Sequence, residues 1–474
     1  MGSIIWDLSK YKIKTALDTG KNRVTYGQLA EKSKNFSSTI NHRTLVFLFS
    51  SNTIPSVVGY VGCINNGIVP VMIDGLNFDA KQVKHLIDVY HPEYLWLPNR
   101  SIDAFSEYDA DIVLECEGYL LLRMTSFNVP VLHENLALLI TTSGSTGSPR
   151  LVRQSYDNIL ANTKSIIEYL HISDIDRTIT TLPMSYVYGL SIVNTHLYAG
   201  ASIILSDFSV LQKEFWELLK EERVTSFGGV PYIYEMLDKL RFFNMELPFL
   251  RQVTQAGGKL PIELHKKFAK WADDNNKEFV AMYGASEATA RMAYLPSERA
   301  LEKPGSIGIA IPGGRFELQD DNTGIIEETE KPGELIYYGD NVTLGYAESV
   351  DDLSLGDEQN GVLRTGDIAT VDEDGYYYIV GRKKRFLKIY GKRTSLDDVD
   401  AMLIDEFNTA DIASAGTDDH LTVYTAQEIE DNEIISFLSL KLGINRAAFK
   451  VRHIDSIPRN PSGKILYHEL GKNV

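Results

Sequence analysis

The chain of 474 residues has few cysteines, no long apolar run and no excess of basic residues. Two isolated cysteines, Cys63 and Cys116, exclude a disulfide framework and a cysteine-based metal cluster, and they favour the reducing cytoplasm. No stretch approaches the roughly 20 apolar residues that cross a bilayer, so we expect no transmembrane segment. The N-terminus lacks a basic segment followed by an apolar core, so we also expect no secretory signal.

Acidic residues outnumber basic residues, 64 against 47, which gives a formal net charge of −17. This balance argues against a nucleic-acid-binding surface, although it identifies no partner. The length is sufficient for two or more domains with substantial cores.

Short β-branched runs alternate with amphipathic helical patterns. Thr44–Ser50 and Gly67–Ile73 are predicted strands, and Ile54–Asn65 between them has helical spacing. Such alternation predicts an α/β fold with parallel sheets covered by helices. From about Gly305, strand-like runs separated by Gly, Asp and Asn turns predict a β-rich lobe. The basic run Gly381–Arg385 then precedes a predicted small α+β domain.

A loop rich in Gly, Ser and Thr follows the apolar run Leu136–Ile140. From Thr141 to Arg150 it reads Thr-Thr-Ser-Gly-Ser-Thr-Gly-Ser-Pro-Arg. A strand that leads into such a loop suits a polyphosphate, because glycines let the backbone approach the ligand while amides and hydroxyls donate hydrogen bonds. The Gly-Lys-Ser/Thr ending of a Walker loop is absent, which disfavours the usual P-loop fold. Taken alone, the run is more typical of a flexible surface loop.

Further motifs follow this loop in a fixed order. They are Gln255–Leu260, Tyr283–Glu287, Arg364–Asp367, Gly381-Arg382 and Pro458–Lys464. Each alone is a weak signal, because glycine turns with a nearby charge are common. Together, over nearly the whole chain, they resemble the adenylate-forming superfamily of acyl- and aryl-CoA ligases, luciferases and peptide-synthetase adenylation domains.

The resemblance implies a large N-terminal domain, residues 1–382, and a small mobile C-terminal domain, residues 383–474, with a hinge near Lys384. In such enzymes a carboxylate attacks the α-phosphate of ATP, and the products are an acyl-adenylate and pyrophosphate. A thiol, usually that of CoA, then displaces AMP. The implied ligands are therefore ATP, Mg²⁺, a carboxylic acid and CoA. After adenylation the C-terminal domain is expected to rotate, and Gly391 then helps line a thiol tunnel.

The resemblance also assigns residues to the nucleotide. Those expected around ATP are Thr142, Ser143, Gly144, Ser145, Thr146, Gly147, Arg150, Gly257, Gly258, Tyr283, Gly284, Ser286, Glu287, Asp367 and Arg382. Among them Glu287 is expected to hold Mg²⁺, since a hard cation needs oxygen ligands. Asp367 is expected to accept the ribose hydroxyls. Lys464 is the expected catalytic lysine, because a long cation stabilises the negative charge that gathers around phosphorus.

The segment Leu182–Leu190 resembles the aromatic-rich substrate element of acyl- and aryl-CoA ligases. Tyr186 is expected to gate or line the acyl pocket, with ordinary core packing as the alternative. Val187 falls near the place where amino-acid-activating relatives carry Asp. An apolar residue there would leave an ammonium unpaired, which disfavours an α-amino acid. The other predicted pocket residues are Phe227, Gly228 and Met292, with glycine leaving space for an acyl chain or a ring.

Three functions stay open at this point. The first is an ATP-dependent ligase that makes an acyl-CoA. The second is a stand-alone adenylation enzyme that loads a carrier protein or forms an amide; we expect no fused carrier domain, since the chain ends soon after Lys464. The third is a nucleotide-binding homologue without catalysis, against which the presence of Glu287, Asp367 and Lys464 argues.

Overall fold

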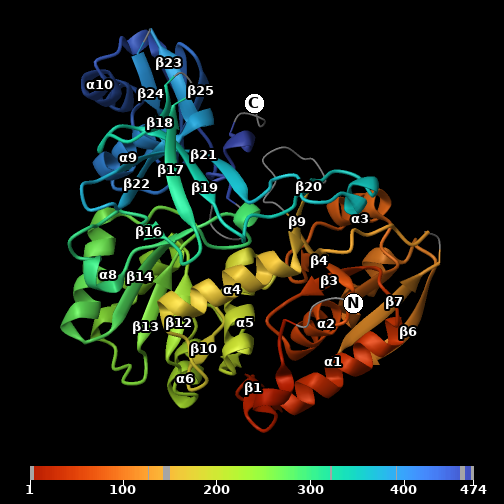
Figure 1. Cartoon of the computed structure of the whole chain (residues 1–474). Helices are drawn as coiled ribbons and strands as arrows, with labels where there is room; N and C mark the ends of the chain where they lie inside the picture. Colours follow the sequence, from red (N-terminus) through yellow and green to blue (C-terminus); the bar gives the residue numbers. More distant parts are fainter. Residues whose placement is uncertain are drawn as a thin grey trace. The chain divides into compact units, whose positions relative to one another are not determined.

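A computed structural model describes residues 5–125, 128–141, 150–320, 323–390, 392–459 and 465–470. These residues form two compact units (Figure 1). The first unit extends to Arg315 and resumes over Tyr338–Leu363, and the second comprises Phe316–Tyr337 and the described residues from Arg364 onward. This grouping follows packing, whereas the boundary at residue 383 describes where the chain would pivot. That boundary and its hinge stay predictions.

One large sheet of the first unit has a parallel centre. In order its strands are β16 (Ile309–Ala310), β15 (Ala293–Tyr294), β14 (Glu278–Tyr283), β13 (Gln252–Gln255), β12 (Ser226–Gly229), β10 (Arg177–Ile179), β11 (Ser202–Ile204), β1 (Thr15–Asp18) and β2 (Arg23–Thr25). The strands from β14 to β1 are parallel, and the flanking strands are antiparallel. The carboxyl ends of the parallel strands therefore lie at one edge.

A second large sheet contains the strands that the sequence predicts most clearly. In order these are β20 (Gly345–Ala347), β9 (Leu151–Ser155), β8 (Leu136–Thr141), β4 (Val69–Asp74), β3 (Leu45–Ser50), β5 (Tyr94–Pro98), β7 (Tyr119–Met124) and β6 (Ala110–Cys116). Strands β8, β4, β3 and β5 are parallel. Every residue of β3 is buried, as expected for a parallel strand with both faces covered. The parallel arrangement predicted for this region is thus confirmed.

Helices cover both faces of these sheets. They are α1 (Tyr26–Ile40), α2 (Ile54–Ile64), α3 (Ala80–Tyr90), α4 (Tyr156–Leu170), α5 (Val187–Ala199), α6 (Lys213–Glu221), α7 (Pro231–Lys239) and α8 (Ile262–Asp274). Short 3₁₀ helices are η1 (Leu8–Tyr11), η2 (Asn99–Phe105), η3 (Phe242–Asn244), η4 (Ser286–Ala288), η5 (Ser297–Arg299) and η6 (Asp351–Ser354). None of the helices in the described ranges combines the length and apolar composition that a bilayer crossing requires.

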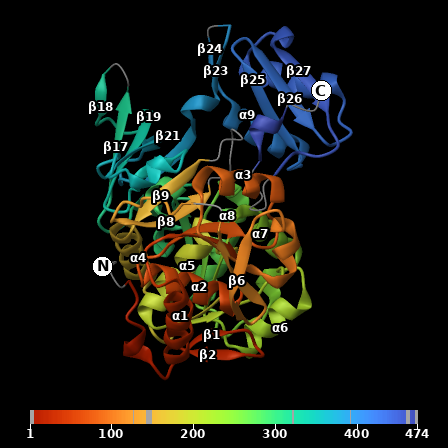
Figure 2. The same ribbon diagram turned by 90° about the vertical axis from the view of Figure 1, so that its right-hand side faces the viewer.

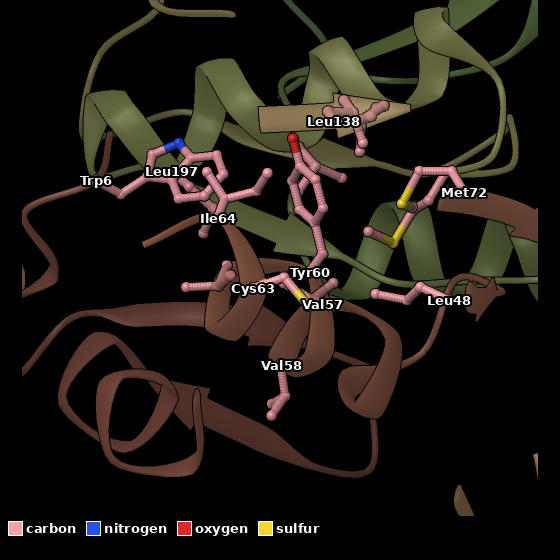
Figure 3. Close-up of a cluster of buried hydrophobic side chains, with 14 of the residues drawn as sticks. Trp6, Leu48, Val57, Val58, Tyr60, Cys63, Ile64, Met72, Leu138 and Leu197 are labelled. Carbon is pink, nitrogen blue, oxygen red and sulfur yellow. The ribbon is translucent and has the colours of Figure 1, made fainter. Parts of the chain in front are cut away.

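The main core lies where α1, α2, α4 and α5 pack between strands of both sheets. Figure 3 shows α2 in this core, with Tyr60 among Leu48, Leu138 and Leu197. The Tyr60 hydroxyl donates to Oδ1 of Asn194 on α5 over 2.9 Å. A separate cluster packs α3 against the other face of β3 and β4. Helix α4 begins directly after β9, and Tyr188 near the start of α5 lies against Gly228 of β12.

The second unit combines a small sheet with an α+β segment. Its strands and helices are β18 (Gly324–Ile326), β17 (Arg315–Asp320), β19 (Gly333–Tyr338), β21 (Val362–Val371), β22 (Tyr377–Arg382), η7 (Lys383–Arg385), β23 (Phe386–Ile389), β24 (Lys392–Ser395), α9 (Leu396–Phe407), β25 (Ile412–Thr417), β26 (His420–Thr425), α10 (Asp431–Leu442), η8 (Arg446–Ala448), β27 (Phe449–His453) and η9 (Tyr467–Glu469). Helices α9 and α10 pack with the β25–β26–β27 sheet in one hydrophobic cluster. Figure 2 shows α9 beside these three strands. The α+β character predicted after the basic run is confirmed.

Candidate active site

Several predicted residues lie outside the described residues. These are Thr142, Ser143, Gly144, Ser145, Thr146, Gly147, Gly391 and Lys464, and the side chain of Lys384 is not described either. The flanks of the Gly/Ser/Thr loop are described: β8 ends at Thr141 and β9 begins at Leu151, and these two residues are antiparallel partners. The loop predicted to follow a strand therefore joins two neighbouring strands of one sheet.

Strand β14 leads directly to Glu287. Gly284 follows the strand, and a Cβ at this position would lie 1.8 Å from the carbonyl oxygen of Ala290, so only glycine lets the chain fold back here. The return is made by Thr289, which has φ 65° and ψ −59°. The amide of Ala290 donates to the carbonyl of Ala288 over 2.7 Å, which closes a γ-turn of the rare, strained kind. Strain of this type persists only where the surroundings over-determine it.

Buried side-chain amides supply that support. Nδ2 of Asn341 donates to the carbonyl oxygens of Ala288 and Arg291, over 2.9 and 2.8 Å. Nδ2 of Asn162 donates to the same Arg291 carbonyl over 2.9 Å. The Thr289 hydroxyl donates to the Asn341 carbonyl over 2.8 Å. Because an unmet buried carbonyl is costly, these bonds hold the turn in one conformation.

The Glu287 carboxylate has a defined partner. The hydroxyl of Tyr346, on β20, donates to its Oε1 over 2.7 Å. The guanidinium carbon of Arg150 lies 3.2 Å from the centre of the Tyr346 ring, and its Nε lies 3.6 Å from a carboxylate oxygen of Glu348. Burial and the nearby Glu287 charge raise the pKa of Tyr346, so it stays a hydroxyl donor. The two predicted residues Arg150 and Glu287 are thus brought together through a tyrosine that the sequence analysis missed.

Two glycines predicted to lie around ATP, Gly257 and Gly258, are close to the predicted acyl-pocket tyrosine and to Pro231. Gly257 follows β13 with φ 86°, and a Cβ there would lie 2.7 Å from the hydroxyl oxygen of Tyr186. Gly258 lies against Pro231. Nε2 of Gln255 donates to the Gly258 carbonyl over 2.9 Å, which fixes the turn. Burial raises the pKa of Tyr186, while the charge of Arg291 acts in the opposite direction.

The space that we expected Gly228 to leave is filled by another side chain. A Cβ at Gly228 would lie 2.6 Å from the hydroxyl oxygen of Tyr188, and that hydroxyl bonds to the carbonyl of Thr254 over 2.8 Å. Burial raises the pKa of Tyr188 to about 12, and the Arg291 charge lowers it. The glycine therefore admits Tyr188, and the expectation of room for substrate at this position is corrected.

Phe227 occupies the opposite face of the same strand. Its side chain is 1% exposed and lies edge-on to Phe215 and Phe242, with ring centres 6.4 and 6.2 Å apart. Successive side chains of a strand point to opposite faces, so Phe227 and Gly228 cannot both form one pocket wall. Phe227 belongs to the aromatic core behind the sheet, and we do not retain it as a substrate contact.

Val187 and Met292 both lie close to the strained turn. Val187, at the start of α5, lines a small cavity together with Thr289 and Ala290. Met292 is fully buried, and its amide donates to the carbonyl of Tyr283 over 2.9 Å. The structure therefore brings the predicted substrate residues near the predicted magnesium-binding residue.

In the second unit, Asp367 and Arg382 are opposite one another on β21 and β22. Nε of Arg382 lies 3.2 Å from Oδ1 of Asp367, and the Asp side chain is 12% exposed against 63% for the Arg. Gly366 precedes the aspartate with φ 71°. The family resemblance assigns Asp367 to the ribose and Arg382 to ribose or phosphate, and the strand register explains how two positions 15 residues apart become neighbours.

The chain after Arg382 is tied to α9. The Arg382 amide donates to Oδ2 of Asp397 over 3.1 Å, and Nε of Arg385 donates to Oδ1 of the same carboxylate over 2.5 Å. Nη2 of Arg385 also donates to Asp400 over 2.6 Å. Both carboxylates belong to the acidic start of α9, so the segment around the predicted hinge is anchored to that helix.

The family model for the AMP-binding enzyme matches residues 6–347. A 4-coumarate–CoA ligase from Narcissus pseudonarcissus is 28% identical over 356 residues, which cover 71% of this chain and 64% of the relative. A long-chain-fatty-acid–CoA ligase from Mycobacterium tuberculosis is 28% identical over 346 residues, which cover 70% of this chain and 66% of the relative. The matched region thus spans slightly less than two thirds of these relatives.

Solved structures share the fold at lower identity. The O-succinylbenzoate coenzyme A synthetase from Bacillus subtilis in complex with ATP and a magnesium ion has a TM-score of 0.80 and 22% identity, with 99% of each chain covered. ATP-bound MatB from Rhodopseudomonas palustris has a TM-score of 0.78 and 18% identity, covering 100% of this chain and 99% of that one. These similarities confirm the predicted α/β fold class with its separate C-terminal lobe.

Proposed function

Because the chain belongs to the AMP-binding enzyme family, we propose that it activates a carboxylic acid with ATP and transfers the acyl group to the thiol of CoA. The observation that carries this proposal is the Glu287 carboxylate, held by Tyr346 at the end of β14 on a strained turn. A carboxylate so fixed suits a catalytic role better than a solvated loop. The relatives named as CoA ligases support CoA as the acceptor.

The proposed reaction has two steps. A carboxylate oxygen of the acid attacks the α-phosphorus of ATP, the bond to pyrophosphate breaks, and an acyl-adenylate forms. The CoA sulfur then attacks the acyl carbon, AMP leaves with the bonding electrons, and the thiol proton passes to solvent. In the first step two anions approach one another, so the residues in the site have to offset charge and fix geometry.

The residues present fit a magnesium–ATP complex. The described residues contain no group of three His, Cys, Asp or Glu side chains that would hold a metal by themselves. Glu287 offers one carboxylate, and Mg²⁺ typically uses one or two carboxylates together with substrate phosphates. Bound Mg²⁺ would neutralise phosphate charge. Tyr346 would orient the carboxylate, and Arg150 would add a positive charge for the phosphates.

The remaining roles follow the family pattern. Thr142 to Gly147 would wrap the β- and γ-phosphates, with Ser286 contacting a phosphate oxygen. Gly257 and Gly258 would lie against adenine, with Tyr283 and Gly284 close by. Asp367 would accept the ribose hydroxyls, with Arg382 beside it. Lys464 would stabilise the transition state of adenylation, and Lys384 would serve as the hinge between the two steps.

The acid is proposed to be an acyl or aryl acid without an α-ammonium group. Val187 offers no carboxylate to pair with an ammonium, and the charge that acts on the adjacent Tyr186 is the positive one of Arg291. Tyr186 and Met292 are the proposed lining. We also propose a cytoplasmic location, since Cys63 and Cys116 are both free thiols in the described part of the chain.

A direct test incubates the protein with Mg-ATP and a panel of fatty, hydroxy, aryl and amino acids. Pyrophosphate release and hydroxylamine trapping report adenylation, and adding CoA or a phosphopantetheinyl carrier protein reports the acceptor. We expect acid-dependent pyrophosphate release, acyl-CoA formation, and loss of adenylation in Lys464→Ala with ATP binding retained. Transfer to the carrier protein but not to CoA would overturn the acceptor, and a Lys464→Ala variant with the wild-type rate would overturn the lysine assignment.

A further inference from the structure

Arg291 is a buried cation at the end of the strained turn. Arg291 is 3% exposed. The guanidinium carbon lies 3.9 Å from the centre of the Tyr188 ring. Nε lies 3.4 Å from Sδ of Met282, and Nη1 donates to the carbonyl of Ala290 over 3.3 Å. These neighbours are all neutral, and the described residues contain no carboxylate that pairs with Arg291.

This arrangement meets part of the guanidinium's hydrogen-bonding capacity and none of its charge. Arginine has five N–H donors and cannot lose its proton in a protein. The sulfur is a weak acceptor, the Ala290 carbonyl takes one donor, and the Tyr169 hydroxyl takes another. A buried charge without an opposite charge costs several kcal/mol unless something compensates it. Stacking on Tyr188 offsets only about 2 kcal/mol of that cost.

The position of Arg291 ties it to the substrate region. Tyr188 lies in the segment that resembles the acyl-pocket element, and its hydroxyl contacts Gly228 and Thr254. The charge of Arg291 reaches Tyr186, whose hydroxyl lies against Gly257. The carbonyl that Arg291 contacts, that of Ala290, faces Gly284 at the end of β14. The cation therefore lies against Tyr188, within the segment that resembles the acyl-pocket element, and Met292 follows it in the chain.

We propose that Arg291 binds a second carboxylate of the acid, so that the enzyme activates one end of a dicarboxylic acid. The inference rests on the proposed function and names its substrate class. A planar guanidinium with unused donors matches a carboxylate in both charge and geometry. The second carboxylate would supply the opposite charge that the protein lacks, while the first reacts with ATP.

The same charge also explains which acids would be rejected. A monocarboxylic acid of equal length would leave the guanidinium without an anion, and a site with an unmet buried group discriminates strongly against such an analogue. An α-amino acid would bring an ammonium near a like charge. A diacid should therefore exceed its matched monoacid by about 10-fold to 100-fold in kcat/KM, the range of one charged hydrogen bond.

The test measures acid-dependent pyrophosphate release with matched pairs: butanoate and succinate, hexanoate and adipate, octanoate and suberate, benzoate and phthalate. Wild type, Arg291→Met and Arg291→Lys are compared. We expect wild type to prefer the diacid in at least one pair by about 10-fold or more. That preference should vanish in Arg291→Met and survive in part in Arg291→Lys.

Arg251→Met is the matched control. Arg251 is a half-buried arginine just before β13, and it is paired with Asp176 and Glu278. Its loss should lower thermal stability and leave the diacid preference unchanged. If Arg291→Met fails to fold, the wild-type preference and the Arg291→Lys variant still decide the question.

The outcomes separate the two proposals. Turnover of monoacids without any diacid preference would overturn the role of Arg291 and leave the proposed function intact. A preference that persists in Arg291→Met would assign the second carboxylate to other residues, and so would also overturn the inference. Silence with every acid, while ATP still binds, would contradict the proposed function itself and the inference that rests on it.

Discussion

Two buried arginines in the first unit show opposite uses of the same side chain. Arg153, on β9, is completely buried, and its guanidinium donates to the carbonyls of Tyr346 and Leu344 over 2.9 and 3.0 Å. It also bonds to the carbonyl of Leu355 and forms an ion pair with Glu358. Its donors are shared among fixed acceptors, and it joins β9 to β20 and to the chain beyond.

Arg291 has nearly the same burial but meets neutral neighbours. Burial alone therefore does not distinguish a structural cation from a functional one. What separates them is whether the fold itself supplies the acceptors. The region of Arg153 should therefore control stability, and the turn that carries Glu287 and Arg291 should control chemistry.

The largest expected effect is that of Glu287→Gln. It removes the charge proposed to hold Mg²⁺ but keeps the shape and the Tyr346 contact, so adenylation should fall by roughly 100-fold to 1,000-fold. The readout is the rate of pyrophosphate release. Glu278→Gln is the matched control, because Glu278 lies at the other end of β14 and pairs with Arg251. Equal losses in both variants would contradict a special role for Glu287.

Arg153→Met should lower the stability of the protein without changing its choice of acid. It removes the guanidinium donors from the buried carbonyls of Leu344 and Tyr346, of which Leu344 keeps only the Glu358 amide, so the free energy of unfolding should fall by about 3 kcal/mol. Urea unfolding followed by circular dichroism measures this change. The relative rates with different acids should stay as in wild type. A changed acid preference without loss of stability would contradict the structural role assigned to Arg153.

Tyr346→Phe should have a smaller effect. The ring under Arg150 remains, and only the hydroxyl that orients Glu287 is lost, so the KM for Mg-ATP should rise by about 10-fold. Steady-state kinetics at varied Mg²⁺ concentration would check this, with excess Mg²⁺ restoring part of the rate. Tyr60→Phe is the control, because it removes a comparable buried hydrogen bond from a tyrosine hydroxyl, in this case to Asn194 in the main core. An identical kinetic change in that variant would mean that Tyr346 acts only through stability.

The smallest effect is expected for Asn341→Ala. Two of its hydrogen bonds hold the carbonyls of Ala288 and Arg291, but Asn162 shares the second one. Loss of these bonds should lower kcat by about 5-fold, because the turn at Thr289 would become less rigid. Substrate affinity should change less than kcat. Unchanged kcat with a lower melting temperature would show that the turn keeps its geometry without this amide.

The sequence predicted the parts of the fold that rest on local patterns. β3 and β4 are apolar on both faces, and α2 between them has helical spacing, so each was recognisable alone. Glu287 and Asp367 were identified by their motifs rather than by any physical property of an isolated carboxylate.

The remaining features depend on contacts between distant positions. Tyr346 reaches Glu287 from 59 residues away, and nothing around it in the sequence signals that hydroxyl. Arg291 lies next to a motif, but its burial and its neutral surroundings are properties of the tertiary structure. Phe227 was predicted to line the pocket because the glycines beside it suggested free space, but its side chain lies on the face of β12 opposite to that of Gly228. The pairing register of a strand, and the face of the sheet to which each side chain points, are determined by the whole sheet.

The most direct test of the account is acid-dependent exchange of labelled pyrophosphate into ATP, which reports the first half-reaction without any acceptor. Wild type and Glu287→Gln are assayed with the matched monoacid and diacid pairs. The account predicts exchange in wild type with a diacid, strongly reduced exchange with the matched monoacid, and almost none in Glu287→Gln. Absence of exchange with every acid, in a folded protein that binds ATP, would contradict it.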